Sequence, residues 1–183
     1  MLIRVAQPQD MPEVYKITHD VYVGEGYCET QPDGMLRHYS HIDNIPETIV
    51  FIVEDNGKII GTNSLTFDGP KKFHVDEDFG DIVEQIRQEN RKVAASWRIV
   101  TTDGRTVILK LISATVEKCR DEHVDILLCS FNPKHARFYE RILGMRVIAE
   151  KYCRAVNAPA VLMRGDAEQV FPAWDKFNKK RIR

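Results

Sequence analysis

The stretch "SFNPKHARFYERILGM", residues 130–145, carries both the start and the stop signal of one short helix. Asn132 is a good N-cap, and Pro133 suits the first helical position, where its missing N–H costs no hydrogen bond. Gly144 supplies the left-handed residue that commonly ends a helix. Three side chains between these signals recur at spacings of three and four and share one face: Ala136, Tyr139 and Leu143. The stretch therefore predicts a helix with a tyrosine on its inward side.

The segments around this helix alternate between strand and helix patterns. "VDILLCSF" before it, residues 124–131, is apolar almost throughout, as a strand covered on both faces would be. Upstream, residues 93–102 predict a strand and 107–123 a helix. Downstream, 145–153 and 158–164 predict the closing strands. This succession is typical of an α/β domain.

The N-terminal part adds antiparallel strands. Residues 2–7 predict a first strand, and 8–23 an amphipathic helix. Residues 48–67 predict a hairpin, because Asp55-Asn56-Gly57 is a strong turn signal between two apolar strands. The fold predicted for the whole chain is a mixed, mostly antiparallel central sheet flanked by helices on both faces.

The chain of 183 residues is long enough for one sizeable core and short for two. We therefore predict a single domain over residues 1–166, with an insertion at about 70–91 whose end is helical. Residues 167–183 are predicted to form a helical, basic tail.

Composition excludes several classes of protein. Hydrophobic residues make up 43% and charged residues 29%, and the formal net charge is −1, as in ordinary globular proteins. Near-neutrality argues against nucleic-acid binding, and no apolar run approaches the roughly 20 residues of a membrane span. The first residues show no signal-peptide pattern, so a cytoplasmic location is expected.

The cysteines do not predict a metal site. Cys28, Cys119, Cys129 and Cys153 are far apart, whereas zinc sites use closely spaced ligand pairs. We expect reduced thiols, as is usual in the cytosol, and Cys119 falls on the core face of its predicted helix.

The order of elements and the stretch "NPKHARFYERILGM" resemble the GNAT acyltransferase superfamily. Combined with "VNAPAVLM" (156–163) and "VYVGEGYC" (21–28), they look most like the long-chain N-acyl amino acid synthases, which are related to acyl-homoserine lactone synthases. The resemblance covers most of residues 1–166. It implies an acyltransferase that moves a long-chain acyl group from the pantetheine thioester of acyl carrier protein to the amine of an amino acid, with no tightly bound cofactor.

The resemblance also implies where the thioester arm lies. In the superfamily, the strand matched here by 96–102 offers free backbone amides to the pantetheine, and the next strand splays away. The donor-binding residues implied are Ile99, Val100, Thr101, Asn132 and His135. Tyr139 takes the position of the acid that protonates the thiolate, and a phenol pKa near 10 suits that transfer. The alternative is that Tyr139 is a core aromatic residue.

The expected phosphate site departs from the superfamily's glycine-rich motif. Here "TTDGRTV" keeps only Gly104, followed by Arg105 and Thr106. A helix N-terminus with one arginine can hold a single phosphate, which favours a carrier-bound donor over coenzyme A. The carboxylate of Asp103 nearby would repel the phosphate of either donor; the alternative is that Asp103 caps the helix.

The proton acceptor is the least defined group. The lactone-synthase relatives tend to place a glutamate where this chain has Ala94-Ala95, so the sequence suggests Glu25 instead. His38, His41 and His74 are rivals by intrinsic pKa, an ordered water is another, and a solvated loop residue is the alternative for Glu25. Arg98 is predicted to bind the substrate carboxylate; the alternative is an ordinary sheet arginine paired with an acid.

Two further features leave alternatives open. The side chains of Phe73, Phe79, Ile82 and Ile86 could roof a long acyl chain or simply pack on the sheet. The terminal "NKKRIR" could dock an acidic carrier protein or be merely solvated.

Two other functions remain possible from the sequence. One is a short-chain or acetyl coenzyme A N-acetyltransferase. The other is a non-catalytic module that binds acyl carriers or lipids.

Overall fold

The computed structural model of the protein describes residues 1–153 and 158–181. Within these residues seven strands form one sheet, in the order β1-β2-β3-β4-β5-β7-β6. The strands are β1 (Leu2–Val5), β2 (Thr48–Asp55), β3 (Lys58–Phe67), β4 (Val93–Thr101), β5 (Ile126–Phe131), β6 (Arg146–Cys153) and β7 (Ala158–Asp166). Only β4 and β5 pair in parallel, and the other neighbours are antiparallel. The predicted mixed, mostly antiparallel sheet is confirmed.

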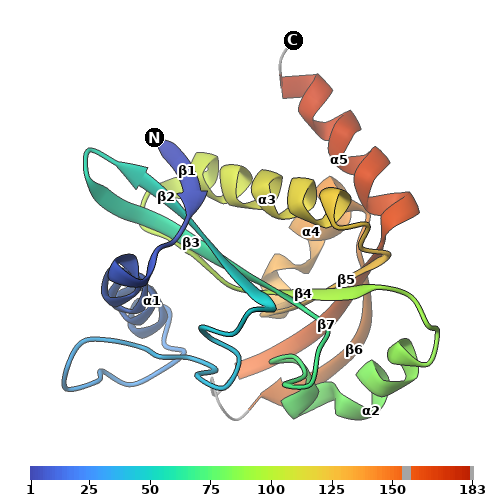
Figure 1. The fold of residues 1–183 in the computed structure, drawn as a ribbon, viewed down its shortest axis with the longest axis horizontal. Coiled ribbons are helices and arrows are strands. Elements are labelled where there is room, and N and C mark those ends of the chain that lie inside the picture. Colours follow the sequence, from blue (N-terminus) through green and yellow to red (C-terminus); the bar gives the residue numbers. More distant parts are fainter. Residues whose placement is uncertain (154–157, 182–183) are drawn as a thin grey trace.

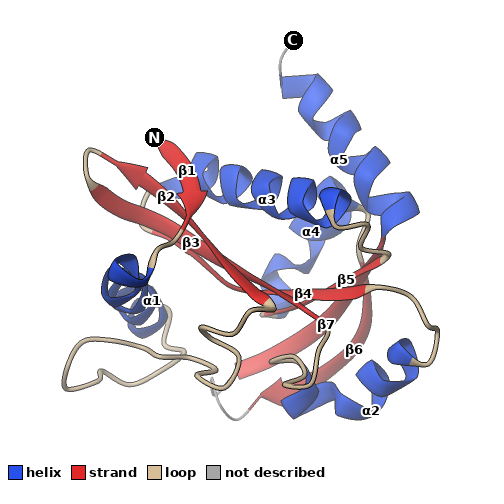
Figure 2. Ribbon diagram, viewed as in Figure 1, coloured by secondary structure: helices blue, strands red, loops and turns tan. Residues whose placement is uncertain are grey.

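Helices cover both faces of this sheet (Figures 1 and 2). The α-helices are α1 (Met11–Gly24), α2 (Asp76–Arg87), α3 (Gly104–Asp121), α4 (Ala136–Leu143) and α5 (Ala167–Arg181); the 3₁₀ turns are η1 (Pro8–Asp10) and η2 (Pro133–His135). Helices α3 and α4 lie on one face, α1 and α2 on the other, and α5 packs beside α4. None of these described helices combines the length and hydrophobicity that crossing a bilayer demands.

The helix between Asn132 and Gly144 forms as its sequence signals predict. The Asn132 side chain accepts a hydrogen bond from the Lys134 amide, and Gly144 ends α4 with φ +63°. Ala136, Tyr139 and Leu143 are all buried in the core between α3, α4, α5 and the sheet. The first turn is 3₁₀, as is frequent at helix termini.

The strands β4 and β5 separate halfway along their length. Their pairing runs from Val93↔Ile126 to Ser96↔Cys129 and stops there. Beyond that point β4 continues along β3, while the last residues of β5 follow β7. The splayed strand pair expected of the fold is therefore confirmed.

A β-bulge lies directly beyond the point of separation. Thr62 pairs with Val100 and Ser64 with Trp97, so β4 holds one residue more than β3 in this interval. Arg98, at the bulge, has φ +55°, in the left-handed region that non-glycine residues seldom adopt. The bulge redirects β4 where it leaves β5.

The insertion does not roof the cavity with its large apolar side chains. Phe73, Phe79 and Ile86 are buried against β4, β5 and β7, and Ile82 packs on the same cluster. Of the two interpretations left open by the sequence, the structure shows packing on the sheet. The reason is the amphipathic face of α2, which covers an otherwise exposed apolar surface.

Candidate active site

A cavity of about 580 Å³ lies where β4 and β5 separate. It is lined from both faces of the sheet, by α4 on one side and by α1 and the segment before α2 on the other. All of the predicted site residues except Gly104 and Thr106 line it: Glu25, Arg98, Ile99, Val100, Thr101, Arg105, Asn132, His135 and Tyr139. The fold thus brings together residues that are far apart in the chain.

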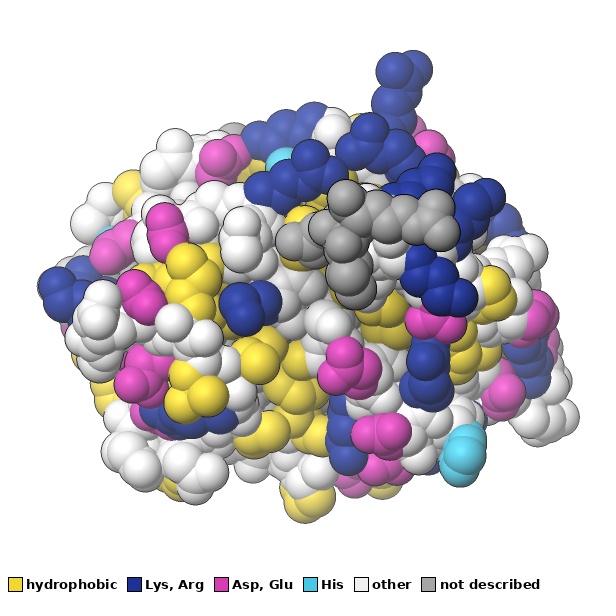
Figure 3. Space-filling model, turned by 90° about the horizontal axis from the view of Figure 1, so that it is seen from above, with side chains coloured by type: hydrophobic (Ala, Val, Ile, Leu, Met, Phe, Trp, Pro, Cys, Tyr) yellow, Lys and Arg dark blue, Asp and Glu magenta, His cyan; other side chains and the backbone are white. Residues whose placement is uncertain are grey.

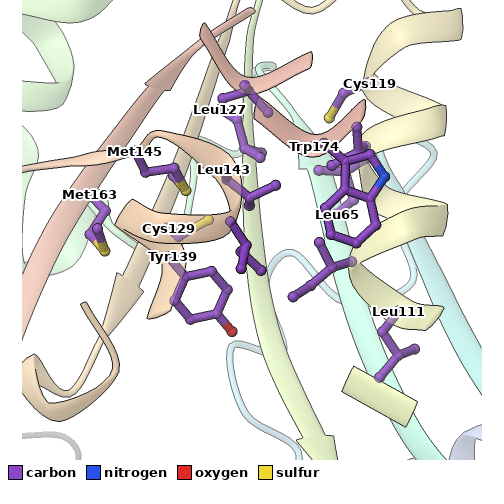
Figure 4. Close-up of a cluster of buried hydrophobic side chains, with 14 of the residues drawn as sticks. Leu65, Leu111, Cys119, Leu127, Cys129, Tyr139, Leu143, Met145, Met163 and Trp174 are labelled. Carbon is purple, nitrogen blue, oxygen red and sulfur yellow. The ribbon is translucent and has the colours of Figure 1, made fainter. Parts of the chain in front are cut away.

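Tyr139 is held in place by its aromatic neighbours. Its ring stacks on Phe131 at the end of β5, with centroids 4.0 Å apart, and meets Phe138 edge to face. Figure 4 shows the hydroxyl oxygen on the far side of the ring from Met145, Leu143 and Cys129. Tyr139 is therefore a core aromatic residue and a cavity residue at once.

The expected phenol pKa near 10 is wrong for this environment. Burial raises the pKa of Tyr139 well above its ordinary value. The same loss of solvation raises the pKa of a thiol, as it does for the buried Cys129 beside it. A thiolate formed in this cavity would therefore also be a stronger base than in water, and the phenol stays protonated at neutral pH.

The start of α3 is open toward the cavity mouth. Asp103 at the N-cap makes no side-chain capping bond, so the capping alternative for this residue is wrong. Its own amide donates to Thr101 Oγ1, at 3.0 Å, and Gly104 turns the chain with φ +69°. Arg105 is exposed and lies over the Phe138 ring, 5.5 Å from its centroid. The free amides of the first turn and this guanidinium could bind one phosphate.

Arg98 is fully committed inside the protein. Its guanidinium donates to both carboxylate oxygens of Asp43, at 2.7 and 3.0 Å, and to Ser64 Oγ, at 2.8 and 3.1 Å. The ion pair is buried, with side-chain exposures of 0% for Arg98 and 2% for Asp43. The structure shows the alternative of a sheet arginine paired with an acid. Arg98 attaches the loop after α1 to the sheet and does not present a free fork to a substrate.

Glu25 lies at the rim of the cavity in an exposed ion pair. Lys134 Nζ donates to its carboxylate at 2.5 Å, and this bond lowers the pKa of Glu25. A carboxylate with a lowered pKa is a weaker base, so its environment favours the solvated-loop interpretation.

The three histidines named as rivals differ in position. His38 and His74 line the cavity, whereas His41 is exposed and does not. Burial lowers the pKa of His38 to about 4 and that of His74 to about 3, so both rings are neutral at physiological pH.

A cluster of side chains on the α1 side of the cavity was not predicted from the sequence. Tyr22, Tyr39, Trp97, Asp78 and Cys153 all line it. Tyr22 stands within the quoted "VYVGEGYC", and the aromatic run "HYSH" was a signal in the loop after α1. Asp78 and Cys153, which meet at 3.0 Å from α2 and β6, carried no local signal.

One family model matches most of the chain. The family model of the N-acyl amino acid synthase FeeM matches residues 13–166. No curated protein sequence matches the chain.

Solved structures share the fold. FeeM, an N-acyl amino acid synthase from uncultured soil microbes, matches with a TM-score of 0.83 at 22% identity, covering 94% of this chain and 99% of that chain. The coenzyme A-dependent acyl-homoserine lactone synthase BjaI, solved with SAM and isopentyl-CoA, matches with a TM-score of 0.67 at 16% identity. The match covers 93% of this chain and 83% of that chain. A GNAT-family acetyltransferase from Streptococcus pneumoniae matches with a TM-score of 0.60 at 14% identity. The match covers 90% of this chain and 98% of that chain.

Proposed function

Since the chain belongs to the FeeM family of N-acyl amino acid synthases and is an N-acyltransferase of the GNAT fold, we propose that it joins a long-chain acyl group to an amino acid. The donor in this proposal is the phosphopantetheine thioester of acyl carrier protein. The observation that carries the proposal is the cavity at the splayed strands, which is open to both faces of the sheet and has Tyr139 in its wall.

The splay suits an extended thioester arm. Beyond Ser96, the edge of β4 that faces β5 has lost its partner strand, so its backbone groups are available to the amides of pantetheine. Asn132 at the base of α4 retains its side-chain NH₂ as a further donor, because only its oxygen is used in the cap. The volume of the cavity falls within the range of about 300–1,000 Å³ that is usual for ligand sites.

The chemistry requires two proton movements. The neutral amine attacks the thioester carbon, the C–N bond forms, the C–S bond breaks, the amine loses a proton and the sulfur gains one. In our proposal Tyr139 gives its proton to the sulfur. The lowered pKa of Glu25 makes solvent at the cavity mouth the acceptor that we favour for the amine's proton.

The region around the start of α3 favours a donor with one phosphate. Gly104 is the one glycine in that turn, and Arg105 the one arginine. Carrier-bound pantetheine has a single phosphodiester, whereas coenzyme A has a pyrophosphate in its place, which needs backbone approach over several residues. Arg141 also lines the cavity and is exposed, which is the observation that favours coenzyme A as the second candidate donor.

Basic side chains near the C-terminus could dock an acidic carrier protein. Lys176, Lys179 and Lys180 are exposed on α5, which packs beside α4. Figure 3 shows Lys and Arg side chains gathered at the upper right of that view. Within "NKKRIR", residues 182–183 lie outside the described residues. Complementary charge would mainly speed the encounter of the two proteins.

The test compares donors under identical conditions. Purified protein is incubated with a set of amino acids and either palmitoyl carrier protein or palmitoyl coenzyme A, and N-acyl products are measured by mass spectrometry. Faster product formation with the carrier-bound donor supports the proposal. Product only from acetyl or other short acyl coenzyme A would replace it with the short-chain alternative, and no product from any donor would favour the binding module.

A further inference from the structure

His74 is a buried polar side chain at the cavity. It lies just before α2, is 4% exposed and forms part of the cavity wall. Among the described residues, neither Nδ1 nor Nε2 has a hydrogen-bond partner. A neutral imidazole has one donor and one acceptor nitrogen, and most buried polar atoms in folded proteins are paired. A buried imidazole in a cavity wall, with no partner for its nitrogens among the described residues, calls for a functional explanation.

The ring cannot easily turn toward another partner. Its centroid lies 5.3 Å from that of Tyr39 and 6.0 Å from that of Trp97. Trp97 is itself fixed, because its indole N–H donates to Thr66 Oγ1 at 2.9 Å. The aromatic neighbours therefore hold the imidazole at the cavity without accepting or donating a hydrogen bond to either ring nitrogen.

His74 and Tyr139 line the cavity from opposite faces of the sheet. Trp97, next to His74, directly follows the last residue of β4 that pairs with β5. Tyr139 reaches the cavity from α4 and stacks on Phe131 at the end of β5. If the sulfur of the thioester lies beside Tyr139, the opposite side, with His74, is left for the attacking amine.

We propose that His74 is the polar contact of the acceptor subsite and accepts a hydrogen bond from the amine of the bound amino acid. This inference rests on the proposed function and deepens it. The contact leaves the amine's lone pair free for the thioester carbon, and the second ring nitrogen donates to another polar atom of the acceptor. Because burial lowers the pKa of His74 to about 3, the ring is neutral and a weak base, which suits a binding contact better than proton removal.

Three substitutions at this position test the assignment. His74→Phe keeps a flat ring and removes both nitrogens, while His74→Asn and His74→Gln each restore an amide near Nδ1 or Nε2. For each variant we would measure KM for donor and acceptor separately, and the urea midpoint of the ligand-free protein. His41→Phe, at an exposed histidine outside the cavity, is the matched control.

We expect His74→Phe to raise the acceptor KM at least tenfold, to leave the donor KM unchanged and to keep or raise the urea midpoint. One of the two amide variants should recover part of the loss. A merely structural histidine would instead lower the midpoint and affect both KM values.

Two outcomes overturn the assignment. The first is an acceptor KM in His74→Phe equal to that of the wild type. The second is a loss that follows the urea midpoint in all three variants. Wild-type protein that forms no N-acyl product would instead overturn the proposed function, and this assignment with it.

Discussion

The rings of Phe131 and Tyr139 are stacked, with centroids 4.0 Å apart and planes inclined by 3°. Phe131 is the last residue of β5 and Tyr139 lies on the second turn of α4, so the stack connects the splayed strand to the helix beside it. This contact sets the position of the phenol relative to the cavity where β4 and β5 separate.

Tyr139→Phe removes one oxygen and keeps the stacked ring. If the hydroxyl protonates the leaving thiolate, kcat should fall by roughly 10²–10⁴-fold, the range for general acid catalysis, while the thermal midpoint changes little. Steady-state kinetics with a saturating acyl donor measure this. Tyr152→Phe, at a side chain that is 60% exposed on β6, is the control and should keep full activity. Unchanged kcat in Tyr139→Phe would rule out the proton-donor role.

Phe131→Leu tests the stack itself. The substitution keeps an apolar side chain, so the unfolding free energy should fall by only about 1 kcal/mol. The phenol, however, loses the surface that fixes its plane, and kcat should fall more than donor KM changes. Urea denaturation and donor-dependent kinetics separate the two effects. A variant as active as the wild type would show that the stack only stabilises the fold.

Arg98→Met should destabilise the protein strongly, because it leaves the Asp43 carboxylate buried without its cation. Breaking such a pair costs about 3–5 kcal/mol of unfolding free energy. The double variant Arg98→Met/Asp43→Leu should recover much of that loss, as measured by urea denaturation of the wild type and both variants. An intact unfolding free energy together with a raised acceptor KM would instead restore the role of Arg98 as a carboxylate anchor.

Lys179→Glu/Lys180→Glu tests the carrier-docking surface on α5. At low salt, KM for acyl carrier protein should rise roughly tenfold, which corresponds to about 1.4 kcal/mol, and the effect should shrink as salt screens the charges. KM for acyl-pantetheine, which lacks the carrier, should not change. Lys58→Glu/Lys71→Glu carries the same charge change at exposed sites away from α5 and is the control. Equal effects of both double variants would indicate net charge alone.

The protein should lose stability between pH 6.5 and pH 4. In the unfolded chain histidines titrate near 6.5, whereas burial holds the folded pKa of His38 at about 4 and that of His74 at about 3. In this window the unfolded state binds more protons, so the unfolding free energy rises with pH, by up to about 1.4 kcal/mol per pH unit for each group. Urea midpoints at several pH values measure the slope. His38→Gln should reduce the slope of the urea midpoint with pH, and the exposed His41→Gln should not. Equal slopes in the wild type and His38→Gln would contradict the attribution of this slope to buried His38.

Local features of the sequence were enough to predict the elements that frame the site. Asn132 and Gly144 mark the ends of the helix that carries Tyr139, and Asn56-Gly57 turn the hairpin with φ +49° and +75°. Each of these signals acts within a few residues, through a steric preference or a capping bond, and so can be recognised without knowing the fold. The family resemblance extended these predictions to a splayed pair of strands and to part of the set of residues that line the cavity.

Only the tertiary structure decided what those residues contact. Arg98 meets Asp43, which is 55 positions away, and this partner turns a predicted substrate anchor into a buried ion pair. Burial raises the pKa of Tyr139, and His74 lies in the cavity wall while its neighbours Phe73 and Phe79 cover the sheet. Such outcomes depend on desolvation and on which distant segments share a cavity. These are properties of the assembled core, and a short sequence motif does not contain them.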